Sequence, residues 1–219
     1  MRLLGAIFDM DGVLLDSNYI WRDLGARFLR RYGKEPEKNL RSVLQPLTME
    51  DTAIYFRDHY QIPRTAEEIA REMTDIIREE YTQNAPAKEG VDKVLSLLKM
   101  RGVTMYVATA TERELAEAAL RRTDLARYFK GIMTCSEAGA SKVSPLIYEK
   151  CLTRLRCDKQ HCMVFEDSLR AIRTASTAGF RVTAVYDEDS ADVQEEIRTM
   201  AEYYIRSYAD WFEHSEEFQ

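Results

Sequence analysis

Apolar residues along the second half of the chain follow two alternating patterns. Between residues 91 and 98 they recur at positions i, i+3, i+4 and i+7, which predicts a helix with one buried face. Gly102 can take the left-handed conformation that ends a helix, and the apolar run 103–108 then predicts a strand. This order returns three times, with helices expected at 111–122, 144–155 and 168–179 and strands at 131–135, 162–165 and 182–185. The alternation predicts an α/β fold, a Rossmann-like parallel sheet with helices on both faces.

The first part of the chain departs from this alternation. Residues 3–8 form an almost wholly apolar run, which is typical of a strand buried on both faces. Residues 17–83 show only helical periodicity, and Thr65 and Glu68 have the spacing of a capping box at the start of one helix. An all-helical segment is therefore expected between the first two strands.

The length of the chain agrees with an insertion. A single compact unit of 219 residues would be large, while two full domains would each be small. We therefore expect an α/β core formed by residues 1–15 and 88–219, with a helical cap subdomain of residues 16–87 inserted into it.

Charge and composition limit the classes of partner. The chain has 45% hydrophobic and 31% charged residues, as in an ordinary globular protein. Its 31 Lys and Arg against 37 Asp and Glu give a net charge of −6. The chain therefore lacks the excess of positive charge that is typical of proteins that bind nucleic acid or an anionic membrane. An anionic substrate would have to be bound by a few placed groups or by a metal ion.

The location of the protein is also constrained by the sequence. No apolar run approaches the ~20 residues of a membrane span, and Asp9 and Asp11 interrupt the apolar stretch at the start, which argues against a signal peptide. The four cysteines lack the spacing of a zinc site and are expected to be reduced. A cytoplasmic protein is expected, and nothing in the sequence demands more than a monomer.

Two aspartates directly follow the first predicted strand. Asp9 and Asp11 stand where ligands bind in open α/β sheets, beyond the carboxyl end of a strand. One carboxylate can bind a metal ion while the other is held protonated as a general acid. Gly12 permits a turn that brings backbone N–H groups close to an anion. The alternative is a polar turn without chemistry.

The second core strand is followed by several groups that can donate hydrogen bonds to an anion. Thr109 and Ala110 place a hydroxyl and backbone N–H groups at the start of a helix, an arrangement suited to an anion. Thr111 and Glu114 have the spacing of a capping box at the same place. Threonines at such positions more often only cap the helix.

Later strand ends add a cation and two carboxylates. Lys142 precedes a helix, where a lysine is electrostatically unfavourable. Glu166 and Asp167 follow the strand 162–165, and adjacent carboxylates at a strand end are typical of a Mg²⁺ site. The alternatives are a solvated lysine and an aspartate that caps a helix.

Together these residues indicate phosphoryl transfer, because that reaction needs phosphate charge neutralised, a nucleophile aligned and the leaving oxygen protonated. In this order, Asp-x-Asp, Thr, Lys and Glu-Asp, the chain resembles the haloacid dehalogenase superfamily. The resemblance is to its branch with a helical cap, which includes sugar phosphatases and β-phosphoglucomutase. It covers nearly the whole chain and implies a late strand at 201–205.

The resemblance implies roles for individual residues. Asp9 would be the nucleophile that forms an aspartyl-phosphate, and Asp11 would protonate the departing alcohol and then activate water. Thr109, Ala110 and Lys142 would hold the phosphoryl oxygens. The presence of Asp11 argues against a dehalogenase, because members with that activity lack the second aspartate.

The resemblance also implies a magnesium site. Mg²⁺ would be held by the carboxylate of Asp9, the main-chain carbonyl of Asp11 and the carboxylate of Asp167. Glu166 would lie beside these ligands or behind them.

The inserted segment differs from that of β-phosphoglucomutase. It has Trp21 where the mutase pattern has a histidine, and no basic residue over 44–51 to grip a second phosphate. Its Asp-Ser-x-x-x-Trp opening is instead similar to that of bacterial sugar and polyol phosphatases. Packing between cap helices is an equal alternative for Trp21. Candidates for contact with the substrate are Trp21, Tyr19, Met49 and Tyr55.

The sequence therefore favours a Mg²⁺-dependent phosphatase, a phosphomonoester hydrolase that acts on a small phosphorylated metabolite, such as a sugar or polyol phosphate. One alternative is a β-phosphoglucomutase-like phosphomutase. An alternative from another class is a non-catalytic module, either a phosphate-accepting receiver domain or a ligand-binding protein.

Overall fold

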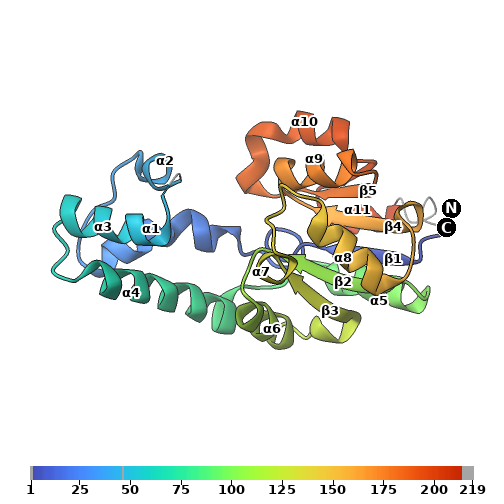
Figure 1. Ribbon diagram of the computed structural model, residues 1–219, viewed down its shortest axis with the longest axis horizontal. Helices are drawn as coiled ribbons and strands as arrows, with labels where there is room; N and C mark the ends of the chain where they lie inside the picture. Colours follow the sequence, from blue (N-terminus) through green and yellow to red (C-terminus); the bar gives the residue numbers. More distant parts are fainter. Residues whose placement is uncertain (1, 46, 214–219) are drawn as a thin grey trace. The chain divides into compact units, whose positions relative to one another are not determined.

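The computed structural model describes residues 2–45 and 47–213. Within them, six strands form one sheet in the order β3-β2-β1-β4-β5-β6, and every neighbouring pair is parallel (Figure 1). The α/β class predicted from the sequence is confirmed. The strands are β1 (Gly5–Phe8), β2 (Thr104–Thr109), β3 (Phe129–Thr134), β4 (Cys162–Glu166), β5 (Arg181–Val185) and β6 (Tyr203–Ile205).

Helices cover both faces of this sheet (Figure 1). Successive residues of a strand point to opposite faces. Ile7 and Val164 accordingly share one apolar cluster with residues of α8, α9 and α10. Phe8 and Phe165 stack at 4.1 Å between ring centroids on the other face, where Phe165 also contacts Trp211 of α11. The helices are α5 (Val91–Met100), α6 (Arg113–Arg122), α7 (Cys135–Ala138), α8 (Leu146–Leu155), α9 (Leu169–Thr177), α10 (Gln194–Met200) and α11 (Tyr208–Glu213), with 3₁₀ turns η2 (Ala126–Tyr128), η3 (Lys159–His161) and η4 (Glu188–Val193).

The third strand differs from its predicted range, 131–135. It begins at Phe129 and ends at Thr134, whose side chain caps the short helix α7 in a capping box with Glu137. Cys135 is therefore the first residue of a helix, whereas the apolar pattern of the sequence predicts it as the end of a strand. The physical reason is that the cap supplies partners for backbone N–H groups that a strand would have paired with a neighbour.

A second unit consists of helices alone. Phe28 of α1 stacks on Phe56 of α3 at 5.4 Å between centroids. Gly25 allows close packing there, because a Cβ atom would lie only 2.5 Å from Leu44 Cδ1 unless that side chain moved. Its helices are α1 (Asn18–Arg31), α2 (Leu40–Leu44), α3 (Met49–His59), α4 (Ala66–Glu79) and the π-helical turn η1 (Glu80–Asn84). Among the described residues, no helix of either unit is long and apolar enough to cross a membrane.

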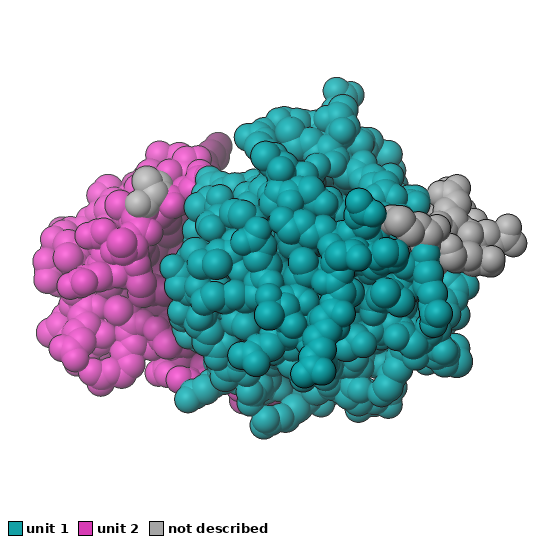
Figure 2. Space-filling model, turned by 45° about the vertical axis from the view of Figure 1, so that its right-hand side comes forward, with its two compact units in different colours: residues 1–16, 85–219 teal, residues 17–84 magenta. Residues whose placement is uncertain are grey.

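Backbone contacts divide the chain into residues 1–16 with 85–219 and residues 17–84 (Figure 2). The two chain segments that lead out of and back into the sheet unit lie side by side. Asp16 N donates to Pro86 O at 2.9 Å, and Lys88 N donates to Leu14 O at 2.9 Å. The helical unit is therefore an insertion whose two ends leave the sheet unit at one place. Its role as a cap stays a prediction.

The capping box predicted at Thr65 and Glu68 is present. Replacing Thr65 with alanine removes the acceptor for the Glu68 N–H, and we expect Thr65→Ala to lower the free energy of unfolding by about 1 kcal/mol. Urea unfolding followed by circular dichroism measures this. Thr74→Ala, on the exposed part of the same helix, is the matched control and should not destabilise. Equal stability of Thr65→Ala and wild type would contradict the assigned cap.

Candidate active site

The chemistry-bearing residues of the sheet unit gather at one edge of the sheet. Asp9 follows β1, Thr109 ends β2 and Glu166 ends β4. Since β1 lies between β2 and β4 and all three run parallel, their carboxyl ends meet at the same edge. Lys142, from the loop after α7, reaches two of these residues.

The loop after β1 is held in a tight turn. Leu14 N and Leu15 N both donate to Met10 O at 2.9 Å. Gly12 lies inside this turn and has a φ of 76°. This is the left-handed region that favours glycine. Asp9 is fixed at the start of the turn, because its N–H donates to Phe165 O of β4 at 3.0 Å.

A largely buried ammonium group joins two carboxylates. Lys142 Nζ lies 2.5 Å from Asp9 Oδ1 and 2.6 Å from Glu166 Oε1. Burial by itself would lower the pKa of Lys142, but the charges of Asp9 and Glu166 outweigh it and raise the pKa above its ordinary value. Lys142 is therefore a fixed positive charge at the strand ends, and the alternative of a solvated loop lysine is wrong.

Asp9, Glu166 and Asp167 form a cluster that fits a hard cation. Each offers an oxygen atom, and the three atoms lie within 4.8 Å of one another. Glu166 is fully buried, yet its Oε2 has no hydrogen-bond partner. Burial, followed by the charge of Glu166, raises the pKa of Asp9 well above its ordinary value, although Lys142 opposes this. A divalent cation would supply the missing partner and favour the ionised form of Asp9.

Two threonines organise the end of β2. Thr109 Oγ1 accepts the Thr111 N–H at 3.0 Å, and Thr111 Oγ1 donates to Asp11 Oδ2 at 2.7 Å. The capping box predicted for Thr111 and Glu114 is absent, since α6 begins at Arg113 without a side-chain cap. The Thr111 hydroxyl donates to Asp11 instead.

The pattern of the sequence missed one residue of this site and one contact of another. Tyr148, on the buried face of α8, donates its hydroxyl to Glu166 Oε1 at 2.8 Å. Its helical spacing is that of an ordinary core residue, so no signal distinguished it. Thr111 belongs to the predicted run of donors after β2, with a helix cap as the alternative, and only its hydrogen bond to Asp11 is not predicted by the sequence.

The four cap candidates all belong to the helical unit, so their relation to the substrate stays a prediction. Trp21 is 50% exposed, and its Nε1 donates to the Tyr81 hydroxyl at 3.0 Å. Tyr55 stacks on His59 at 4.9 Å between centroids, and Met49 is the first residue of α3. Tyr19 donates its hydroxyl to Glu80 Oε2 at 2.7 Å.

Glu80 is the centre of a polar network in the helical unit. It is only 3% exposed and accepts hydrogen bonds from Tyr19, Arg27 and Asn84. Burial acts to raise the pKa of Glu80, but the bonds from Arg27, Tyr19 and Asn84 outweigh it and lower the pKa below its ordinary value. Glu80 begins the π-helical turn, so this network joins α1 to the turn that follows α4.

The chain is similar to known phosphatases. A family model described as haloacid dehalogenase-like hydrolase matches residues 6–185. The chain is 27% identical to the phosphorylated carbohydrates phosphatase of Thermotoga maritima, over 79% of this chain and 80% of that protein. It is 29% identical to the fructose-1-phosphate phosphatase of Escherichia coli, over 81% of this chain and 94% of that protein. A crystal structure from Thermotoga maritima superposes with a TM-score of 0.85 at 23% identity, covering 99% of this chain and 100% of that chain.

The lowered pKa of Glu80 predicts a pH dependence of stability. Because the pKa is lower in the folded than in the unfolded chain, the stabilisation is complete above the unfolded value of about 4.3 and is lost as the pH falls through the folded value. We expect Glu80→Gln to cost about 1–2 kcal/mol of unfolding free energy at pH 7 and progressively less below pH ~4.3. Urea titrations at several pH values measure this.

The matched control is Glu79→Gln, because Glu79 is an exposed neighbour whose nearest cation, Arg31, lies at 3.4 Å. It should change stability by less than about 0.5 kcal/mol at every pH. A Glu80→Gln cost that does not change with pH would rule out the ionised Glu80 as its source.

Proposed function

Because the chain belongs to the haloacid dehalogenase-like hydrolase family and is a phosphatase, we propose that it hydrolyses a small sugar or polyol phosphate, with Mg²⁺ and through an aspartyl-phosphate. The observation that carries this proposal is the largely buried ammonium group of Lys142 between Asp9 and Glu166. The phosphatase relatives named for carbohydrate, hexitol and fructose 1-phosphate support the substrate class.

Asp9 is the nucleophile of the proposed reaction. One of its carboxylate oxygens forms a bond to phosphorus while the bond from phosphorus to the alcohol oxygen breaks. Lys142 Nζ lies 2.5 Å from Asp9 Oδ1. The positive charge of Lys142 therefore lowers the repulsion between the Asp9 carboxylate and the phosphate dianion. Thr109 and Ala110 lie at the adjacent end of β2, where their donors can bind the phosphoryl oxygens.

Asp11 is the proton donor and acceptor. It gives its proton to the departing alcohol oxygen and then takes a proton from the water that hydrolyses the aspartyl-phosphate. The Thr111 hydroxyl donates to Asp11 Oδ2 at 2.7 Å and so holds the carboxyl group in place for this transfer. Thr111 is thus a positioning residue.

Asp9, Asp167 and the main-chain carbonyl of Asp11 would hold Mg²⁺, with Glu166 beside them. When bound, the ion supplies positive charge to the phosphoryl oxygens. Tyr148 and Lys142 both bond Glu166 Oε1 and so orient this carboxylate with Oε2 toward a further partner. A cytoplasmic location, a monomeric state and the cap role of the helical unit complete the proposal.

Replacing the nucleophile tests the mechanism. We expect Asp9→Asn to reduce phosphate release from sugar phosphates by at least about a thousandfold, because no other side chain takes over the bond to phosphorus. Asp92→Asn, on an exposed position of α5, is the charge-matched control and should keep full activity. With glucose 1-phosphate, formation of glucose 6-phosphate without phosphate release would identify a mutase instead. Undiminished hydrolysis by Asp9→Asn would exclude the assigned nucleophile.

The metal site is tested by stability as well as activity. Because Mg²⁺ should bind only the folded chain, millimolar MgCl₂ should raise the melting temperature of wild type and of Asp92→Asn. We expect Asp167→Asn to lose most of this increase and EDTA to stop phosphate release by wild type until Mg²⁺ is restored. A melting temperature of Asp167→Asn that rises with MgCl₂ as in wild type would show that Asp167 is not a ligand.

A further inference from the structure

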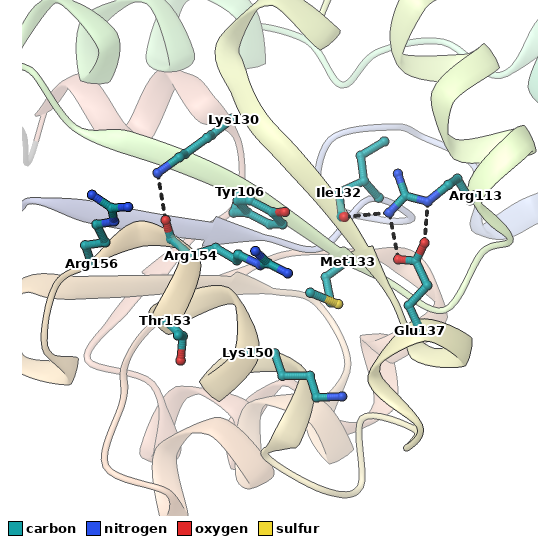
Figure 3. Close-up of a pocket in the computed structure, with 10 residues that line it drawn as sticks. All are labelled: Tyr106, Arg113, Lys130, Ile132, Met133, Glu137, Lys150, Thr153, Arg154 and Arg156. Atoms are coloured by element: carbon teal, nitrogen blue, oxygen red, sulfur yellow. Dashed lines mark hydrogen bonds and ion pairs between the residues drawn. The ribbon is translucent and has the colours of Figure 1, made fainter.

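The sheet unit has an open groove apart from the strand ends that hold Asp9. Its volume is about 690 Å³, and it lies where β2 and β3 meet α6, α7 and α8 (Figure 3). No residue that lines it belongs to the proposed catalytic or metal site. Those used below are Tyr106, Lys130, Met133, Lys150, Arg154 and Arg156.

The groove concentrates positive charge in an acidic chain. Five of its residues are Lys or Arg and one, Glu137, is acidic, while the whole chain carries a net charge of −6. Arg113 is neutralised, because it pairs with Glu137 and Glu117. The other four cations make no ion pair with any residue in the part of the chain that the structure describes.

The two lysines have structural partners, but the two arginines do not. Lys130 Nζ donates to Arg154 O and Lys150 Nζ donates to Ala138 O, each at 2.8 Å. Both carbonyls lie near the ends of helices, where such bonds satisfy acceptors that have no helical partner. These contacts also fix the two ammonium groups at the groove. Within the described residues, the side chains of Arg154 and Arg156 donate no hydrogen bond that serves the fold.

The floor of the groove is apolar and partly aromatic. Tyr106 and Met133 supply much of it, and the Tyr106 ring lies against Gly131. A Cβ atom at Gly131 would be 2.6 Å from the Tyr106 hydroxyl oxygen, so the glycine allows this close approach of ring and strand. Figure 3 shows the Arg154 side chain extending toward Tyr106 and Met133. An apolar floor thus stands beside cations.

We propose that this groove is a second binding site, for a small ligand that joins a flat ring system to two or more phosphate groups, which is the chemistry of a nucleotide. The phosphates would be bound by Arg154, Arg156 and the two lysines, since arginine forms paired hydrogen bonds with phosphate oxygens. The ring would pack on Tyr106 and Met133. This site goes beyond the proposed hydrolysis and does not depend on it.

Size and charge favour a small ligand over a macromolecule. A volume of about 690 Å³ is within the range of small-molecule sites. A long nucleic acid would extend beyond the groove onto a chain whose net charge is −6 and would be repelled there. Without a ligand the four unpaired cations repel one another, and a bound polyanion relieves this repulsion.

Calorimetric titration of the full chain with ADP tests the proposal, in low salt and with EDTA present so that no metal ion supports binding at Asp9. We expect ADP to bind, and pyrophosphate and adenosine each to bind at least about tenfold more weakly, because each lacks one half of the contacts. Raising the salt concentration should weaken ADP binding.

The variant Arg154→Gln with Arg156→Asn removes the two arginines. Asparagine is chosen at 156 because that residue has φ of 60°, which asparagine tolerates. We expect ADP binding to weaken at least about tenfold. The control, Arg2→Gln with Lys93→Gln, removes the same charge at exposed positions outside the groove and should bind ADP within about twofold of wild type. Melting temperatures confirm that both variants are folded.

Four results would overturn the proposal. These are no binding of ADP at millimolar concentration, equal loss of binding in the control variant, adenosine or pyrophosphate binding as tightly as ADP, and a single-stranded oligonucleotide binding more tightly than ADP.

Discussion

The ammonium group of Lys142, held between Asp9 and Glu166, is the interaction around which the sheet unit is organised. Three charged groups are buried together, and burial of any one of them alone would cost several kcal/mol. The lysine offsets part of the repulsion between the carboxylates, but one positive charge does not balance Asp9, Glu166 and Asp167. A bound cation would neutralise the remaining negative charge and give Glu166 Oε2 the partner that it lacks.

The parallel sheet makes this arrangement possible. β1 pairs with β2 on one side and β4 on the other, so residues about 100 and 157 positions apart in the chain meet at one edge. β1 and β4 are buried and apolar as far as Phe8 and Phe165, and their carboxylates follow at Asp9 and Glu166. Tyr148 then contributes the one polar group of α8 that reaches the site from the core. The buried apolar strands thus position a small group of charged side chains at the carboxyl edge of the sheet.

Charge is distributed very differently over the rest of the chain. In the helical unit, Glu80 is buried but fully satisfied by Tyr19, Arg27 and Asn84, so it stabilises α1 against the last turn of the unit. The groove beside α8, by contrast, is lined by four cations without carboxylate partners among the described residues. The net charge of −6 is therefore a poor guide to local potential, and a phosphorylated ligand can be bound by a protein that is acidic as a whole.

The sequence by itself determined the α/β class, the helical insertion and the capping box at Thr65, because periodicity and short-range capping act within a few residues. Order along the chain also indicated that Asp9, Thr109, Lys142 and Glu166 belong at strand ends. Only the tertiary structure decided what each side chain touches. Thr111 bonds Asp11 instead of capping α6, and Tyr148 bonds Glu166. The physical reason is that these hydrogen bonds join residues 18 and 100 positions apart, and local sequence patterns do not depend on partners so far along the chain.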